Sequence, residues 1–415
     1  MKKGLLLSVI ASTMIFAGGD IAPVEPAAVA PASDCSDFSG AIGFYYKTKS
    51  TKVGDADANP ALFDEHLIGA TAMIRVEKEI AYGIGFGAEV AGFTSMTADT
   101  ISGEWQSIRG GTLEFGELSE LYLTYSVGNT AVKAGRFALP KKLSPYVWTD
   151  DTQNIKDVTF QGVLVANTDI ADTTIYGAHI WSTIDGSTET YLNANSHPHD
   201  EWGPGLFVLG FVNSSIANTT ISGVGYYTPV AVAVGTNEYV TYAGFLTADT
   251  TFMGLKASVR GGYVGGDDQA SADGSGDATF GVGAKIGGTV DMFDWDLRGT
   301  YISDGQYEIG MMNPFYTSAS QIVGTASYAV EANIAAKVGP GTLYAKGKYT
   351  DWDFEDIVAN TGSKDNSIEG RIGYKMKVFS DVTAKAEYRY KTTSMVRVDD
   401  DTVNQEIRLE ATYAF

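Results

Sequence analysis

Apolar and polar residues alternate along most of this chain. Between residues 121 and 127, for example, Leu121, Leu123 and Tyr125 alternate with Tyr122 and Thr124. The side chains of a β-strand point alternately to its two faces, so a period of two is typical of strands with one apolar face. Over residues 38–415 this pattern predicts about 18 strands (16–18), many of them near the roughly 9–11 residues that cross a bilayer when tilted.

The connections between the predicted strands alternate in length. Tight turns at 76–82, 126–131 and 290–293 alternate with long connections at 94–116, 184–205 and 303–323. Short periplasmic turns and long external loops are typical of outer-membrane barrels. We therefore predict one all-β domain over residues 38–415, a transmembrane antiparallel β-barrel whose long connections are external.

The last strand of this pattern ends on an aromatic residue. Ile407, Leu409, Tyr413 and Phe415 share one parity, and charged residues occupy most of the other. In a bacterial barrel the last strand pairs with the first, and its apolar face contacts lipid. We expect Tyr413 and Phe415 to form the signal that the outer-membrane assembly machinery reads.

The first residues predict export. A basic start at Lys2 and Lys3 precedes an apolar run that ends in small residues, which is typical of a secretory signal peptide over residues 1–19. Residues 20–37 are rich in proline and alanine and predict an extended periplasmic linker. Cys35 is the only cysteine, which excludes an intramolecular disulfide.

Composition narrows the class of function. Charged residues make up 19% of the chain, the net charge is −21 and the mean hydropathy is −0.04, as expected for a barrel with one lipid-facing and one water-facing side. So acidic a chain excludes nucleic acid as a partner and favours cations. The Asp55–Asn59 run resembles the start of a calcium loop, but Pro60 replaces the needed glycine and His66 stands where the glutamate belongs. Two histidines around a proline, as in His197-Pro-His199, are more often only polar than metal ligands, and no Ser/His/Asp grouping indicates an enzyme. We expect no cofactor.

Charge concentrates on one parity of the last strands. Charged residues facing lipid cost about 2–4 kcal/mol each at the bilayer midplane, so these side chains must face a hydrated interior. They predict a pore wall made of Glu369, Arg371, Lys375, Lys385, Glu387, Arg389 and Arg408. The alternative is a ladder of charges that only neutralise one another inside a closed barrel.

The segment 131–165 predicts a constriction. A strand ends near Arg136, Pro140 and Pro145 then interrupt pairing, and about twenty polar residues follow, which is long enough for a functional loop. We expect it to fold inward and to narrow the pore with Arg136, Lys141, Lys142, Asp150, Asp151, Lys156 and Asp157. Arg136 has the outward parity, so its place in the pore requires a break in the alternation at Gly135. A divalent cation could bind at the acidic residues of this loop.

Residues 120–151, ELYLTYSVGNTAVKAGRFALPKKLSPYVWTDD, with FQGVLV at 160–165, resemble the campylobacterial (epsilonproteobacterial) major outer-membrane porin family. The shared elements are a Leu-Tyr-Leu-Thr-Tyr strand, an Ala-Gly-basic strand end and a Trp-Thr-Asp loop. The resemblance implies an eighteen-stranded barrel, a homotrimer and a cation-preferring pore with an inward loop. The chain departs from the family in its Pro/Ala linker and its Lys141-Lys142 pair.

These observations favour an outer-membrane porin for passive diffusion of ions and small polar solutes, with a modest cation preference. Its expected partners are membrane lipid, the permeating solutes, the assembly machinery and two further copies of the chain. Two other classes stay open. One is a structural or adhesive barrel with a plugged lumen, and the other is a barrel enzyme such as a lipase, for which no Ser-His pair is apparent.

Overall fold

A computed structural model describes residues 37–54, 61–64, 66–95, 114–149, 151–152, 155–156, 158–185, 188–191, 205–231, 238–268, 275–307, 314–317, 325–352, 364–395 and 398–415. The predicted signal peptide and nearly all of the predicted linker lie outside these residues, so both stay predictions. Within the described ranges, no helix is long and apolar enough to cross a membrane.

The described secondary structure consists of strands. They are β1 (Asp37–Val53), β2 (His66–Ala81), β3 (Ile84–Ser95), β4 (Glu114–Val127), β5 (Thr130–Phe137), β6 (Asp151–Thr152), β7 (Ile155–Lys156), β8 (Val158–Asn167), β9 (Thr173–Asp185), β10 (Thr188–Tyr191), β11 (Leu206–Asn213), β12 (Thr219–Ala231), β13 (Glu238–Phe252), β14 (Leu255–Gly266), β15 (Thr279–Val290), β16 (Phe293–Ile302), β17 (Ser327–Val338), β18 (Gly341–Trp352), β19 (Lys364–Phe379), β20 (Val382–Met395) and β21 (Val398–Ala414).

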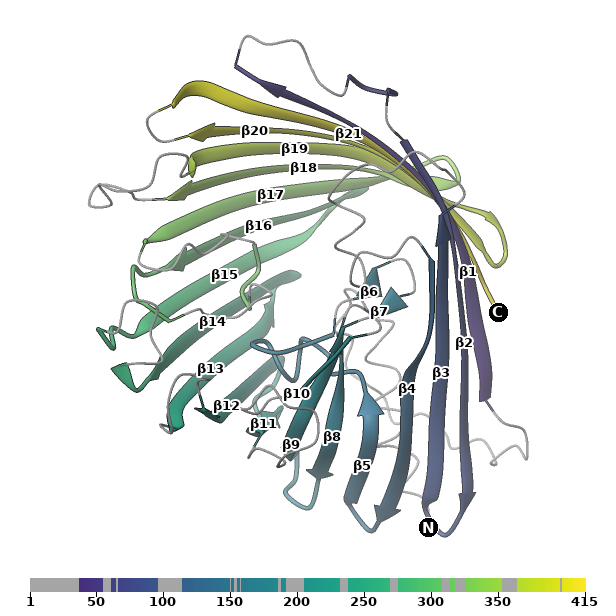
Figure 1. The fold of residues 1–415 in the computed structure, drawn as a ribbon, viewed down its shortest axis with the longest axis vertical. Helices are drawn as coiled ribbons and strands as arrows, with labels where there is room; N and C mark the ends of the chain where they lie inside the picture. The colour runs from purple at the N-terminus through teal and green to yellow at the C-terminus, as the bar shows by residue number, and fades with distance from the viewer. Residues whose placement is uncertain are drawn as a thin grey trace.

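The strands close into one antiparallel barrel. Nineteen of the described strands form a single sheet, and β1 pairs with β21 as well as with β2. The short β10 and the longer β11 pair with different parts of the same side of β9, so the ring has eighteen positions. In Figure 1 the strands follow one another around the molecule, with β21 beside β1 and the β6–β7 hairpin inside the ring. The predicted barrel of about 18 strands is confirmed.

The outer face of the barrel is apolar. Leu121, Leu123 and Tyr125 on β4 are exposed on this face, whereas Tyr122 between them is buried on the inner face. Where strands meet the long connections, aromatic side chains pair across the outer face. The ring centroids of Phe207 and Tyr227 are 6.4 Å apart, and β13, β14, β15 and β16 carry similar pairs. Such an aromatic girdle marks the edge of the apolar band of a membrane barrel.

Short turns of two to five residues join the strands at the opposite end. Gly83, in the turn between β2 and β3, has a φ of 78°, and a Cβ there would overlap the backbone of Ser126. Glycine adopts this left-handed conformation without a steric penalty. Because the number of barrel positions is even, the start of β1 and the end of β21 both lie at this short-turn end.

Candidate pore and its lining

The connection between β5 and β8 folds into the barrel, in agreement with the prediction from the sequence. Leu139 is buried in a cluster of inward-facing residues from β4 to β17, and Leu143 packs against that cluster. The Tyr176 hydroxyl on β9 donates to the Leu143 carbonyl at 2.6 Å. The Tyr146 ring lies 5.3 Å from that of Tyr226 on β12. This segment therefore covers the inner face of β9–β12 and reduces the open cross-section.

Hydrogen bonds across its base fix the shape of this inward segment. The Thr149 amide donates to the Leu139 carbonyl at 2.8 Å, and the Leu139 amide donates to the Thr149 hydroxyl at 3.0 Å. Lys141 Nζ lies 4.5 Å from the ring centroid of Trp148, a cation–π contact, and Lys142 is exposed. The two lysines named from the sequence thus lie on the inward segment.

A second inward connection was missed by sequence reasoning, which placed residues 303–323 outside the barrel. That expectation is wrong for the described residues of this connection. Tyr307 and Phe315 are both 3% exposed and belong to the same inner cluster, and the Phe315 ring lies 6.2 Å from that of Phe245. Aromatic side chains are buried most favourably against other apolar groups, here on the inner wall. The signal in the sequence was the run of apolar and aromatic residues in this connection, which includes Pro314-Phe315-Tyr316.

The opposite wall, formed by β16–β21 and β1, carries charge on its inner face. The structure places all seven predicted wall residues on that face. Glu369, 2% exposed, lies 2.5 Å from Arg371 and 2.8 Å from Arg389. Because Arg371 on β19 stands opposite Arg389 on β20, two arginines eighteen positions apart in the chain share this carboxylate. The charge-assisted hydrogen bonds from the two guanidinium groups compensate for the burial of this carboxylate.

Further ion pairs extend along the inner face toward β21 and β1, where the barrel closes. Lys385 lies 3.6 Å from Glu387 and 3.4 Å from Glu410. Arg408 pairs with Glu406, which also lies 3.1 Å from Lys47 on β1. These pairs join β20, β21 and β1, so the wall is a row of alternating charges rather than a uniformly basic surface.

Among the described residues, Lys375 forms no ion pair and its side chain is exposed. It stands opposite Lys385 in the register of β19 and β20. It therefore presents a free ammonium group to the interior, near the short-turn end of the barrel.

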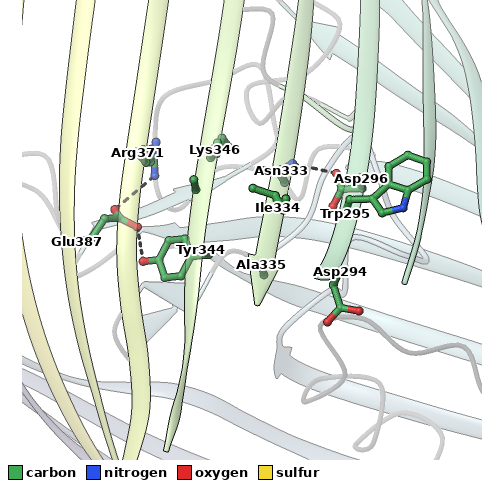
Figure 2. A pocket seen from close by; sticks show the side chains of 11 residues that line it. Asp294, Trp295, Asp296, Asn333, Ile334, Ala335, Tyr344, Lys346, Arg371 and Glu387 are labelled. Atoms are coloured by element: carbon green, nitrogen blue, oxygen red, sulfur yellow. Dashed lines mark hydrogen bonds and ion pairs between the residues drawn. The ribbon is translucent and has the colours of Figure 1, made fainter. Parts of the chain in front are cut away.

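A recess of about 220 Å³ opens on this wall between β16 and β20. Figure 2 shows its two ends: Asn333 donates to Asp296 at 2.9 Å on one side, and Tyr344 donates to Glu387 at 2.7 Å on the other. Arg371 also lines it, 3.8 Å from Glu387. Acidic and basic side chains that donate and accept hydrogen bonds thus line the recess. Such a lining suits the passage of hydrated ions and polar solutes.

A second charged cluster, on β2–β5, was not predicted. Arg75 lies 2.8 Å from Glu77 and 3.5 Å from Glu120, and it donates to the Tyr122 hydroxyl at 3.2 Å. Lys133 lies 4.1 Å from the centroid of the Tyr122 ring. All five residues have the inward parity of their strands, and that parity was the signal that could have found them.

Four predicted constriction residues lie wholly or partly outside the described part of the chain. Asp150 and Asp157 lie outside the described residues. Asp151 and Lys156 are paired in the register of the β6–β7 hairpin, but their side chains lie outside the description. Their role, and the possible divalent-cation site at this acidic stretch, stay predictions.

The prediction that Arg136 points into the pore is wrong. Arg136 stands opposite Leu121 on β4, whose side chain is 50% exposed on the outer face, while the neighbouring Phe137 is fully buried inside. Gly135 has a φ of 127°, but the alternation continues across it. The Arg136 guanidinium donates to the Leu118 carbonyl at 2.6 Å, toward the end of the barrel with the long connections. Arginine on an outer face is tolerated near the membrane boundary, where its cost falls to about 0–1 kcal/mol.

Comparison with known proteins identifies the fold. No protein-family model and no curated protein sequence matches the chain. Solved porin structures do match it. A BenF-like porin from Pseudomonas fluorescens Pf-5 aligns with a TM-score of 0.65 at 13% identity, over 91% of this chain and 99% of that one. The chain has the fold of these porins.

Two further structures agree. OccAB1 of Acinetobacter baumannii aligns with a TM-score of 0.63 at 14% identity, over 91% of this chain and 97% of the other. OccK9 (OpdG) of Pseudomonas aeruginosa aligns with a TM-score of 0.63 at 13% identity, over 91% and 98%. Identities this low establish the architecture alone. The resemblance to the campylobacterial major porins stays a prediction.

Proposed function

We propose that this protein is a porin of the bacterial outer membrane, a passive channel through which ions and small polar solutes diffuse. The proposal rests on one observation: the closed sheet has an apolar outer face and a charged inner face. Outside, exposed side chains such as Leu123 and Leu209 form an apolar surface that suits lipid. Inside, charged side chains such as Arg371 and Lys385 line a wall whose ionised groups require water or partners.

Selectivity would arise between the inward segment and the charged wall. Opposed charges across a narrow passage create a transverse field that favours polar solutes and excludes apolar ones. On the wall, most carboxylates are matched by bases. We infer that Asp150 and Asp151, at the end of the inward segment, tip the balance toward a modest cation preference, and that a divalent cation could bind there.

A recording of single channels in a planar lipid bilayer tests this function. A porin gives stable ohmic steps in symmetric salt. The alternative is a structural or adhesive barrel whose lumen is plugged, in which the two inward connections would seal the interior. Insertion into the bilayer without any conductance steps would favour that alternative and contradict the proposal.

We further propose that three copies assemble and that the outer-membrane assembly machinery reads the C-terminal strand. The first proposal rests on the resemblance of residues 120–151 to trimeric porins. The second rests on the aromatic Tyr413 and Phe415 at the end of an alternating strand. Chemical cross-linking of the native membrane followed by mass determination distinguishes a trimer from a monomer.

A further inference from the structure

The second inward connection packs against the inner face of the barrel. One described part of it, Pro314–Thr317, lies between β16 and β17 in the chain and rests on the inner faces of β13, β14 and β15. Phe315 covers two glycines of β15: a Cβ on Gly281 would lie 2.5 Å from the Phe315 ring, and a Cβ on Gly283 would lie 3.0 Å from the Phe315 Cβ. The absence of side chains at these two positions makes room for the segment.

Two arginines on the inner face of the barrel bind the backbone of this segment. Arg260 on β14 donates to the Pro314 carbonyl and, through Nε, to the Thr247 hydroxyl at 2.8 Å. Its guanidinium carbon also lies 5.4 Å from the centroid of the Tyr316 ring. Arg298 on β16 donates through Nη1 to the Tyr316 carbonyl at 3.4 Å. A planar guanidinium with five donors can bind a wall partner and a loop carbonyl together.

Side-chain contacts complete the attachment. Thr317 donates through its hydroxyl to Glu331 at 3.2 Å, and its amide donates to the Thr300 hydroxyl at 3.4 Å. The Tyr316 hydroxyl shares a hydrogen bond with Ser258. Burial raises the pKa of Tyr316, so this hydroxyl stays protonated and keeps its hydrogen bond over the ordinary pH range. Each of the four residues Pro314–Thr317 is thus held by the wall.

We infer that Arg260 and Arg298 are positioning residues that hold Pro314–Thr317 against the wall, so that this segment fixes a second boundary of the channel. Arg260 is only 8% exposed, and its donors are directed at the segment and at Thr247, so a passing solute meets the segment instead of the guanidinium. The inference rests on the proposed function. It separates these two arginines from Arg136, whose guanidinium lies on the outer face of the barrel and donates to the Leu118 carbonyl.

The first test compares matched variants that each remove one guanidinium. Arg260→Met and Arg298→Met, alone and combined, abolish the donors to the segment but retain much of the side-chain volume. Arg136→Met removes the same charge from the outer face, away from the segment. We expect a larger and noisier unit conductance from the combined variant, and an unchanged unit conductance from Arg136→Met. Equal unit conductance in the combined variant and the wild type overturns the inference, as does an equal rise in Arg136→Met.

The second test is the formation of an engineered disulfide, which is measured without recording conductance. In a Cys35→Ser background, Gly283→Cys with Phe315→Cys places two Cβ atoms 3.0 Å apart, so the segment has to move outward by only about 0.5 Å to reach the roughly 3.5–4.5 Å of a disulfide. We expect rapid oxidation when both arginines are present and slow, incomplete oxidation in the combined methionine variant, measured by gel shift on protein whose folding is checked by heat-modifiable mobility. Once formed, the disulfide should return the unit conductance of the combined variant to the smaller value, and reduction should release it.

The two proposals fail in different ways. A wild-type barrel that inserts but never conducts contradicts the porin function, while the oxidation rates still report on the segment. Conducting channels with equal oxidation rates in both backgrounds support the porin and overturn the role of Arg260 and Arg298.

Discussion

Gly40 and Phe415 join the two ends of the barrel through a reciprocal pair of hydrogen bonds. The Gly40 amide donates to the Phe415 carbonyl at 2.8 Å, and the Phe415 amide donates to the Gly40 carbonyl at 3.0 Å. The Phe415 ring also lies 5.9 Å from that of Phe38 and 5.7 Å from that of Tyr413. The last residue of the chain therefore takes part in closing the sheet.

Deleting Phe415 should strongly reduce the yield of folded protein in the membrane, because both backbone bonds and the ring contacts with Phe38 and Tyr413 are lost at the seam. The folded fraction is measured by heat-modifiable gel mobility of outer-membrane fractions. Phe415→Tyr keeps the backbone pair and an aromatic ring, and should retain most of the yield. Wild-type levels after the deletion would contradict the role assigned to this residue.

Asp150→Asn combined with Asp151→Asn should weaken or reverse the cation preference, because charge at a narrow, low-dielectric passage acts directly on the permeating ion. Asp267→Asn with Asp268→Asn is the matched control, since these acids lie in an outer connection where salt screens charge over about 8–10 Å. Reversal potentials in a salt gradient measure both. Equal shifts would show that the constriction assignment is mistaken, and an anion-selective wild type would mean that the basic wall dominates.

Glu369→Gln should destabilise the barrel by about 1.5–3 kcal/mol, because Arg371 and Arg389 lose the carboxylate between them and repel each other. The midpoint of urea unfolding in detergent, at constant m-value, reports the change. Lys375→Gln alters a charge on the same strand that has no ion-pair partner among the described residues, and should stay within about 0.5 kcal/mol of the wild type. A similar loss in both variants would mean that the shared carboxylate is not what stabilises this wall.

Arg136→Gln should leave the reversal potential unchanged, because the guanidinium lies on the outer face of the barrel. Arg389→Gln, which removes the same charge from the inner wall, should shift selectivity toward cations. The two variants are compared in the same salt gradient. A shift of equal size in Arg136→Gln would place that side chain in the pore and refute the register of β4 with β5.

The mature protein should begin near Asp20. Mass spectrometry of protein purified from outer membranes measures its N-terminus. Recovery of the intact residues 1–19 in that fraction would refute the signal peptide.

Strand directions and faces are local properties, and the sequence predicted them well. The alternation of Glu369, Arg371 and Lys375 with apolar neighbours placed all three on the inner face without knowledge of their partners. Pro140 and Pro145 likewise indicated where strand pairing stops. The Arg136 prediction failed because it required the alternation to break at Gly135, whereas the positive φ of that glycine is accommodated within the regular register.

By itself, then, the sequence determined that this chain forms a closed barrel of about 18 strands with an apolar outside and a charged inside, because side-chain parity depends only on the backbone between neighbouring residues. Only the tertiary structure decided which charges meet. Glu369 reaches Arg389 through the register of β19 with β20, and Arg260 reaches Pro314 across fifty-four positions of the chain. Such contacts depend on strand register and on the path of each connection, and a pattern with a period of two contains neither.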